Sequence, residues 1–312
     1  MSGLLRLENV QKHFYRGFWR RETVRALDGV SLTIEAGTTL AVVGESGSGK
    51  TTLCRVALGL TVPTGGRVLF EGQDLGRLNG NLRPVRRRMQ AVFQDVEGAL
   101  NPRLTVADLL TEPLKVHGLA RGLHGDWIED LLDTVNLSAD LLCRRPHEIS
   151  GGQRQRVAIA RAMALKPRLV VADEPIASLD RSAQAEMLCL LEEIQRQSAV
   201  AYLIVSHDLK SVRYIAHDLA VMFLGVVVEQ GGASEVFHAP AHPYSRALLS
   251  AVPGSGLQPT RMVGEPLGSF AIPAGCRFHP RCPEAAAICA RQVPALKVLA
   301  DGRRVACHAA GA

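Results

Sequence analysis

The sequence predicts an α/β protein built on a parallel sheet, and three observations support this fold class. Residues 39–43 (TLAVV), 169–172 (LVVA) and 200–205 (VAYLIV) are short apolar runs typical of buried strands. Helical patterns separate these runs, as expected when strands and helices alternate along the chain. Residues able to carry chemistry follow each run. Open α/β sheets bind ligands at the carboxyl ends of their strands, so a functional site is expected there.

The composition is that of a folded protein with a sizeable core. Of the 312 residues, 47% are hydrophobic and 21% are charged, which argues against global disorder. This length allows one large domain with an extension, or two domains. The net charge of +6 suits an anionic partner, although an ordinary basic protein could carry the same charge. We expect no signal peptide, and the best apolar run (219–228) is too short to span a bilayer, so an intracellular protein is expected.

Residues 44–51 (GESGSGKT) match the phosphate-binding loop G-x-x-x-x-G-K-[ST]. A strand precedes the loop and a helix follows it, so backbone N–H groups and the helix dipole should point at an anion. Lys50 would contact the β- and γ-phosphates, and the Thr51 hydroxyl would bind Mg²⁺. A glycine-rich surface turn is the alternative, which the flanking elements disfavour. The nucleotide-binding residues expected here are Gly44, Glu45, Ser46, Gly47, Ser48, Gly49, Lys50, Thr51 and Thr52.

Residues 11–25 mix basic and aromatic side chains after a first strand at 5–10. Such mixing can indicate nucleic-acid binding, but an aromatic ring that stacks on adenine near the phosphate loop is a shorter explanation. A surface loop with packed aromatics is the third interpretation. The aromatic residues of this stretch are Phe14, Tyr15, Phe18 and Trp19.

A second helix start of the anion-binding kind occurs at residues 149–156 (ISGGQRQR). Ser150 is a good helix cap, and the helix should run on through Ala164. The residues before it, from about 101 to 146, have a helical pattern that resembles an insertion into an α/β domain. One chain has little use for two such sites on one nucleotide, whereas two chains packed head to tail would use both.

Acidic and polar residues follow the later strands. Asp173 could hold Mg²⁺, and Glu174 is placed to polarise the water that attacks a γ-phosphate; a helix cap is the alternative for this acidic pair. His207 follows the strand at 200–205, where it would contact the γ-phosphate unless it is merely structural. The stretch 178–180 (SLD) then leads into a further helix.

Taken together, these residues resemble the nucleotide-binding subunit of ATP-binding cassette (ABC) transporters. The resemblance covers about residues 4 to 250 and rests on motif order: phosphate loop, Gln94, ISGGQ, the acidic pair, Asp180 and His207. Ile149 stands where the family usually has leucine, and 177–180 reads ASLD where SALD is common. The implied fold is a P-loop NTPase cassette with a RecA-like core, an antiparallel β subdomain and a helical subdomain at about 96–165.

The resemblance also implies a mechanism. Two cassettes would sandwich two ATP molecules, each bound by the phosphate loop of one chain and by the signature of the other. Thr51, Gln94 and Asp173 would hold Mg²⁺, while Glu174, His207 and Gln94 would act in catalysis. Phe14 best matches the aromatic that stacks on adenine, with Tyr15 as the alternative. The residues expected to contact ATP across the dimer are Ser150, Gly151, Gly152, Gln153 and Asp180.

Residues 236–253 and 275–283 look like the tail of the dipeptide, oligopeptide and nickel importer ATPases, and the phosphate loop is closer to the second of their two ATPases. This likeness divides the chain into a nucleotide-binding domain (1–250) and a cysteine-rich extension (251–312). The implied partners are a second ATPase, identical or related, two permeases and an extracytoplasmic solute-binding protein. The implied place is the cytoplasmic face of a bacterial inner membrane. No nucleic-acid partner is expected.

Four of the seven cysteines lie in the extension, at Cys276, Cys282, Cys289 and Cys307. Their spacing lacks the tight C-x2-C pair of a zinc ribbon. Four thiolates could hold zinc or an iron–sulfur cluster, or stay reduced in a small packed region. The importer resemblance implies a [4Fe–4S] cluster. The other cysteines, Cys54, Cys143 and Cys189, lie singly in helical patterns and are expected to be buried.

These observations predict an ATPase that energises import of peptides or nickel. A soluble ABC ATPase for DNA repair or translation is a second class, but such proteins usually carry coiled-coil insertions or tandem cassettes, which this chain lacks. A nucleotide-bound scaffold without hydrolysis is a third class, which the presence of Lys50, Gln94, Glu174 and His207 disfavours. Import of another small solute, such as a sugar or an opine, stays open.

Overall fold

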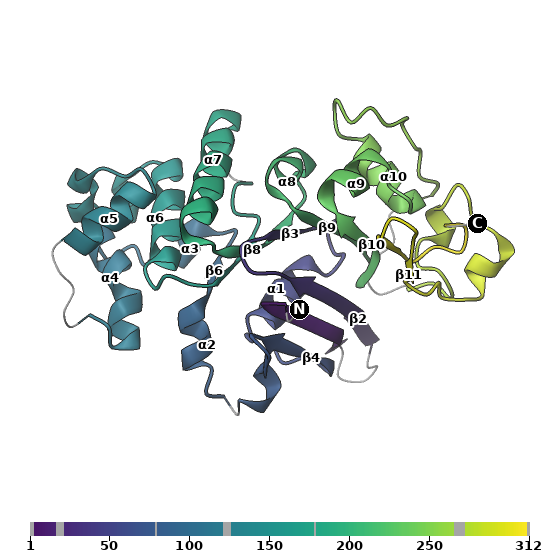
Figure 1. The fold of residues 1–312 in the computed structure, drawn as a ribbon, viewed down its shortest axis with the longest axis horizontal. Coiled ribbons are helices and arrows are strands. Elements are labelled where there is room, and N and C mark those ends of the chain that lie inside the picture. Colours follow the sequence, from purple (N-terminus) through teal and green to yellow (C-terminus); the bar gives the residue numbers. More distant parts are fainter. Residues whose placement is uncertain are drawn as a thin grey trace.

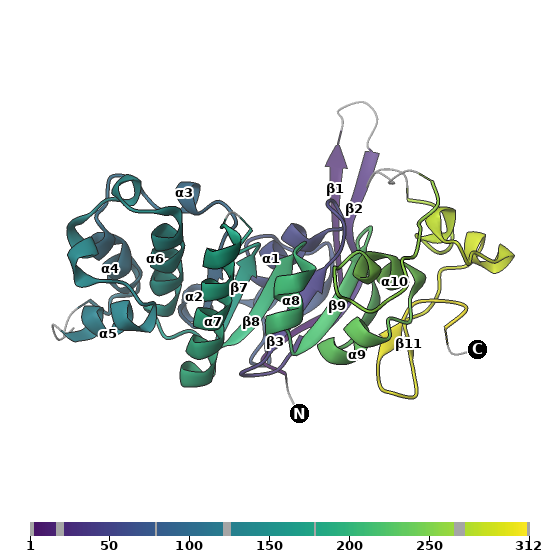
Figure 2. The same ribbon diagram turned by 90° about the horizontal axis from the view of Figure 1, so that it is seen from above.

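The computed structural model describes residues 3–16, 22–78, 80–120, 126–177, 179–264 and 272–310. The molecule is elongated (Figures 1 and 2), with a helical lobe at one end and the C-terminal extension at the other. Two sheets lie between these ends. In the described part of the chain, no helix is long and apolar enough to cross a membrane.

The larger sheet has eight strands in the order β11-β12-β10-β9-β3-β8-β7-β6. Strands β3, β6, β7, β8 and β9 run parallel, and the remaining strands add antiparallel pairs at one edge. Every residue of β3, β7 and β8 is buried, which confirms the expectation from their apolar runs. The strands are β3 (Thr39–Val43), β6 (Met89–Val92), β7 (Leu169–Asp173), β8 (Ala201–Ser206), β9 (Asp218–Phe223), β10 (Val226–Gly232), β11 (Lys297–Val298) and β12 (Arg304–Val305).

Alternate residues of β3 serve two cores. Leu40 and Val42 pack with the helix α1 (Lys50–Ala57) and the smaller sheet, whereas Ala41 and Val43 pack with later helices on the opposite face. Helix α1 therefore lies between the two sheets, and the loop before it is supported from both sides. The helices of the opposite face are α7 (Arg181–Ser198), α8 (Leu209–Ile215), α9 (Ala233–His238) and α10 (Pro243–Ser250). The smaller subdomain has one short helix among the described residues, η1 (Leu75–Arg77).

The smaller sheet is antiparallel, with the order β2-β1-β4-β5. Its first strand continues well past residue 10, so the aromatic and basic stretch is a strand rather than a surface loop as far as Arg16, and Phe14 pairs with Val24. Cross-strand pairing with β2 extends the hairpin, seen upright in Figure 2. Phe18 and Trp19 lie outside the described residues. The strands are β1 (Leu5–Arg16), β2 (Glu22–Ile34), β4 (Gly65–Phe70) and β5 (Gln73–Asp74).

The expected helical insertion forms a lobe with its own apolar core, which continues into β6, β7 and β8. Helix α6 begins at Gly151, directly after the predicted cap Ser150, and ends at Met163, one residue before the predicted end at Ala164. The expectation that the single helical cysteines are buried is right for Cys54 and wrong for Cys143 and Cys189, which lie on outward-facing positions. The lobe contains α3 (Val96–Ala99), α4 (Val106–His117), α5 (Asp126–Thr134), η2 (Ala139–Cys143), η3 (Pro146–Glu148) and α6 (Gly151–Met163). The helix α2 (Arg83–Arg88) lies outside the lobe, and its Val85 packs into the core of α1 and the smaller sheet.

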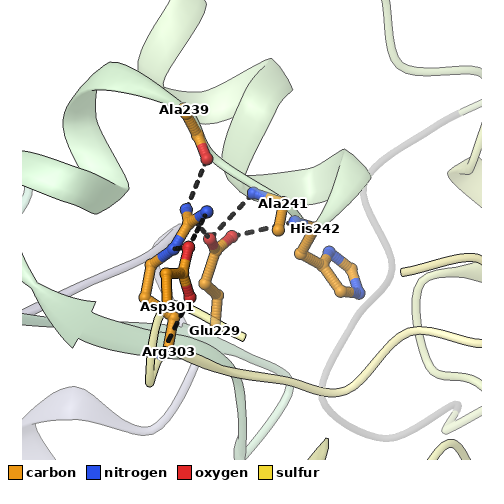
Figure 3. A network of polar contacts seen from close by, with 6 residues as sticks. All are labelled: Glu229, Ala239, Ala241, His242, Asp301 and Arg303. Atoms are coloured by element: carbon orange, nitrogen blue, oxygen red, sulfur yellow. Dashed lines mark hydrogen bonds and ion pairs between the residues drawn. The ribbon is translucent and has the colours of Figure 1, made fainter. Parts of the chain in front are cut away.

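The C-terminal extension is joined to the main sheet, because β12 pairs with β10 and β11 pairs with β12. Glu229 of β10 is fully buried and accepts hydrogen bonds from the backbone N–H groups of Ala241 (2.8 Å) and His242 (2.9 Å), as Figure 3 shows. Arg303, whose side chain is 11% exposed, completes the network 3.4 Å from Glu229. A buried ion pair and two strands thus hold the extension. Its short helices are η4 (His279–Arg281) and η5 (Ala287–Ala290).

Candidate functional site

The phosphate loop connects β3 to α1 and needs glycine at two positions. Gly44 has φ +155° and Gly49 has φ +105°. A Cβ at Gly44 would lie 2.1 Å from the Met222 carbonyl oxygen, and one at Gly49 would lie 2.2 Å from that of Ala26. The loop can therefore pack closely on β9 and β2 only without these side chains.

Lys50 lies beneath the loop with 8% of its surface exposed. Its Nζ donates hydrogen bonds to the carbonyl oxygens of Gly44 (2.8 Å) and Glu45 (3.0 Å). Burial lowers the pKa of Lys50, while Glu174 and Asp173 oppose that change. The ammonium is thus preorganised at the loop, where it can exchange carbonyl partners for phosphate oxygens.

Asp173 ends β7 and is buried. Burial raises the pKa of its carboxyl group, and a hydrogen bond from Thr51 lowers it. A carboxylate beside a hydroxyl is the oxygen-donor chemistry that Mg²⁺ prefers. Asp173 and Thr51, two of the three residues predicted to hold Mg²⁺, therefore lie together and fit that ion.

Glu174 is oriented by two polar side chains. Its Oε1 lies 2.7 Å from His207 Nδ1, and its Oε2 accepts a hydrogen bond from Gln94 Nε2 at 3.0 Å. The backbone of Glu174 has φ +51°, a region that non-glycine residues rarely adopt, and its N–H donates to Val205 O at 2.8 Å. The three residues predicted to act in catalysis thus form one hydrogen-bonded group.

Lys50, Thr51 and the hydrogen-bonded group of Glu174, Gln94 and His207 line one hollow of about 740 Å³. Phe14 lines it as well, with 44% of its surface exposed, and Lys12 Nζ lies 5.1 Å from the centre of its ring. Tyr15 is 66% exposed and is not one of the lining residues, so Phe14 is the better placed of the two aromatics. The hollow is lined by Phe14, Val24, Ala26, Ser46, Gly47, Gly49, Lys50, Thr51, Thr52, Gln94, Glu174 and His207.

The ISGGQ signature lies outside this hollow. Ser150 caps α6: its Oγ accepts from Gln153 N at 3.2 Å, and its own N–H donates to Gln153 Oε1 at 2.9 Å. Within the described ranges, and apart from the adjoining backbone, nothing lies within 4 Å of where a Cβ would be at Gly151 or Gly152. The signature therefore offers an open helix start that the phosphate loop of its own chain does not use.

Asp180 also lies outside the hollow, where it caps α7 and accepts a hydrogen bond from Ala183 N at 2.9 Å. Its neighbour Ser178 lies outside the described residues. A helix cap accounts for the position of Asp180 within one chain. A contact across a dimer stays a prediction for this residue.

The four cysteines of the extension are partly buried. Burial raises the pKa of the Cys276 and Cys282 thiols, and the nearby thiols raise it further: Cys289 and Cys307 for Cys276, and Cys276 and Cys307 for Cys282. In the described ranges, no three histidine, cysteine or acidic side chains are arranged as ligands of one metal ion. The thiols of Cys276, Cys282, Cys289 and Cys307 are thus near one another, but they are not positioned as ligands of a single metal ion.

Two residues near the loop had no sequence signal of their own. Tyr244 is fully buried, and its hydroxyl accepts a hydrogen bond from Glu45 N at 2.9 Å. Arg281 of the extension binds the Glu45 carboxylate through two hydrogen bonds, of 2.8 and 3.1 Å. Both are separated from the loop by about 200 residues of chain or more, so only the fold brings them there.

Two family models match the chain. Residues 27–177 match the model described as ABC transporter, and residues 228–289 match the model described as oligopeptide/dipeptide transporter, C-terminal region. The first match includes the phosphate loop, the signature and the acidic pair. The second includes all of β10 except its first two residues, the helices α9 and α10, and three of the four clustered cysteines.

Curated relatives match over nearly the whole chain. A probable peptide ABC transporter ATP-binding protein of Sinorhizobium fredii is 46% identical and covers 98% of this chain and 90% of its own length. A di/tripeptide transport ATP-binding protein of Pseudomonas aeruginosa is 44% identical, with 99% and 98% covered. An oligopeptide transport ATP-binding protein of Bacillus subtilis is 42% identical, with 98% and 97% covered.

Among solved structures, a dimeric ATP-binding cassette bound to ADP and inorganic phosphate superposes with a TM-score of 0.66. It is 30% identical and covers 73% of this chain and 98% of its own. The cassette part of the chain therefore has a counterpart in that structure, whereas about a quarter of the chain has none.

Proposed function

Because the chain belongs to the ATP-binding subunits of ABC transporters of the oligopeptide and dipeptide type, we propose that its hollow binds Mg-ATP and that a second cassette completes the site. The chain is an ABC ATPase coupled to transport. One observation carries the proposal: the catalytic group lies in the same hollow as the phosphate loop, while the signature lies outside it. A second chain would then supply Ser150, Gly151, Gly152 and Gln153.

The proposal assigns a role to Phe14 and to the polar side chains in and beside the hollow. Lys50 and the loop N–H groups bind phosphate oxygens, and Phe14 stacks on adenine. Thr51, Asp173 and Gln94 would hold Mg²⁺, which would supply positive charge beside the phosphates. Glu174 accepts the proton of the attacking water, while His207 and Gln94 hold its carboxylate in place.

The partners follow from the family. We propose that the second cassette is a related ATPase or a second copy of this chain, and that the pair docks on two permeases served by an extracytoplasmic solute-binding protein. The chain would lie peripherally on the cytoplasmic face of a bacterial inner membrane. The names of the relatives favour peptides as cargo; nickel or another small solute would be revealed by a ligand screen of the copurified binding protein.

The variant Glu174→Gln tests the catalytic role. Its amide is isosteric with the carboxyl group but cannot accept the proton, so ATP should still bind and lock the closed dimer. Loss of a general base lowers kcat by about 10² to 10⁴-fold. ATP turnover and ATP-dependent dimerisation by gel filtration are the measurements. Glu193→Gln, an exposed change whose partners lie on the same helix, is the matched control. Turnover of Glu174→Gln near the wild-type rate would contradict the assignment.

An iron–sulfur cluster on Cys276, Cys282, Cys289 and Cys307 stays a prediction. The shared neighbourhood of these thiols and the chemistry of four sulfur donors support it, whereas the side chains are not arranged as ligands. Anaerobic purification followed by iron and labile-sulfide analysis tests it, with zinc measured in the same samples. Protein that is folded and contains neither iron nor sulfide would rule out the cluster.

A further inference from the structure

Glu45, the second residue of the phosphate loop, has its polar groups bound by other parts of this chain. Its N–H donates to Tyr244 Oη at 2.9 Å, and its carbonyl oxygen accepts from Lys50 Nζ at 3.0 Å. Its carboxylate receives both terminal nitrogens of Arg281, with Nη1 to Oε2 at 2.8 Å and Nη2 to Oε1 at 3.1 Å. This residue is therefore fixed by contacts that do not involve a nucleotide.

The guanidinium of Arg281 is held in a closed site. Its side chain is only 6% exposed. One nitrogen also donates to Met262 Sδ at 3.4 Å, and the group lies 6.0 Å from the ring centre of Phe223. A buried cation of this kind needs its carboxylate partner, and two parallel hydrogen bonds fix the geometry of both groups.

The short segment around Arg281 is itself anchored to the nucleotide-binding domain. Phe278, which is 1% exposed, packs its ring 5.4 Å from those of Phe223 and Tyr244. Arg277 pairs with Asp28 of β2 and hydrogen-bonds to Leu224 O. The packing of Phe278 and the contacts of Arg277 therefore fix the segment from which Arg281 extends to the loop.

The charge of Glu45 matters because of where it lies. The loop directs N–H groups and the Lys50 ammonium at an anion, and a carboxylate within that loop opposes a polyphosphate. The side chain is 31% exposed, so solvent screens it only in part. Arg281 supplies the opposite charge at hydrogen-bond distance.

We propose that Arg281 is a positioning residue for ATP, through which the C-terminal extension completes the nucleotide site: it fixes Glu45 and cancels its charge. This inference rests on the proposed role of the phosphate loop. It assigns a function to a residue outside the region that matches the ABC transporter model. On this proposal, the extension contributes a residue that the nucleotide site needs for full affinity for ATP.

Arg281→Met in the full-length chain tests the inference. We expect affinity for ATP to fall about tenfold and KM to rise with it, while kcat at saturation changes less. Because the effect is one of charge, ADP should lose less affinity than ATP. Arg281→Lys keeps the positive charge but cannot make both parallel hydrogen bonds to Glu45, so it should recover part of the lost ATP affinity. Nucleotide affinities are measured by calorimetry, with thermal melts to verify folding.

Two further variants make the result decisive. The double variant Glu45→Gln/Arg281→Met also removes the negative charge of the Glu45 carboxylate, so no unpaired charge is left to repel ATP. Its affinity for ATP should return to within about threefold of wild type. Arg246→Met is the matched control. It also removes an arginine that pairs with a carboxylate of the extension, Glu284, at 2.8 Å, but both side chains of this pair are exposed and neither contacts Glu45. It should leave ATP affinity unchanged.

Three results would overturn the inference: Arg281→Met binding ATP within twofold of wild type, equal losses for ATP and ADP, or no recovery in the double variant. Lys50→Ala separates this outcome from failure of the proposed function. If Lys50→Ala loses ATP while Arg281→Met does not, only the role of Arg281 is wrong. If Lys50→Ala binds ATP normally, the loop is not the nucleotide site and both proposals fail.

Discussion

Removal of Arg303 should destabilise the protein, because it would leave a buried carboxylate without its cation. Glu229 is fully buried in the network of Figure 3, and in Arg303→Met it would keep its hydrogen bonds from the backbone N–H groups of Ala241 and His242 but would lose its cation. Breaking a buried pair from one side costs about 3 kcal/mol or more. With an unfolding entropy of roughly 2.1 cal/mol/K per residue, that loss lowers the Tm by roughly 5 °C.

The loss should depend on pH, and its sign follows from the pKa of Glu229. Burial raises this pKa, while the backbone N–H groups and Arg303 oppose the rise. Without Arg303, the pKa rises further. A carboxyl group with a raised folded pKa stabilises the protein below its unfolded pKa and loses that contribution as the pH rises through the folded value. The deficit of Arg303→Met should therefore be larger at about pH 8 than at about pH 5.

Urea unfolding followed by circular dichroism at both pH values measures the deficit. Arg304→Met is the matched control, because Arg304 is the next residue of β12 and is exposed; its change should stay within about 0.5 kcal/mol. A deficit of Arg303→Met below about 1 kcal/mol at the higher pH, or an equal deficit at both pH values, would refute the reasoning from a buried ion pair.

Three further predictions concern the nucleotide site. Phe14→Ala should raise the KM for ATP by about tenfold, since stacking contributes roughly 1–3 kcal/mol per base, whereas Tyr15→Ala should leave it unchanged; equal effects would contradict the choice of Phe14. Tyr244→Phe leaves Glu45 N–H without its acceptor and should cost about 1–3 kcal/mol of unfolding free energy, read from thermal melts against Tyr214→Phe at an exposed site. Ser150→Ala removes a helix cap worth about 1 kcal/mol and should also abolish ATP-dependent dimerisation, an effect that capping alone would not produce.

Local patterns in the sequence predicted much of the fold and the groups that line the hollow. The apolar run before Asp173 and the glycine spacing around Lys50 each depend on a few neighbouring residues, and such patterns predict strands, loops and helix starts directly. The resemblance to ABC transporter subunits implied that Gln94, Glu174 and His207 would act together. The structure places these three in one hydrogen-bonded group.

What the sequence did not predict depends on long-range packing. The contact of Arg281 with Glu45 joins residues 236 positions apart, and no local pattern encodes such a pair. The pairing of β12 with β10 was missed for a similar reason, because two-residue strands carry no periodicity. The exposure of Cys143 and Cys189 was mispredicted because a helical pattern shows which residues share a face but leaves unstated which face is covered.

The position of Gln94 explains how hydrolysis could be communicated to the helical lobe. Its side chain donates to Glu174, and the next residue, Asp95, caps α3 by accepting a hydrogen bond from Gly98 N at 2.8 Å. Arg161 of α6 in turn donates to Ala99 O at 2.8 Å. A shift of Gln94 would thus be passed to α3 and then to α6, whose first residues follow the signature serine. Because α6 is a continuous helix with a capped start, it would move largely as a rigid body, and the signature would move with it. On the proposed dimer, we therefore expect these hydrogen bonds to couple chemistry at one phosphate loop to the contact of the same chain with its partner's ATP.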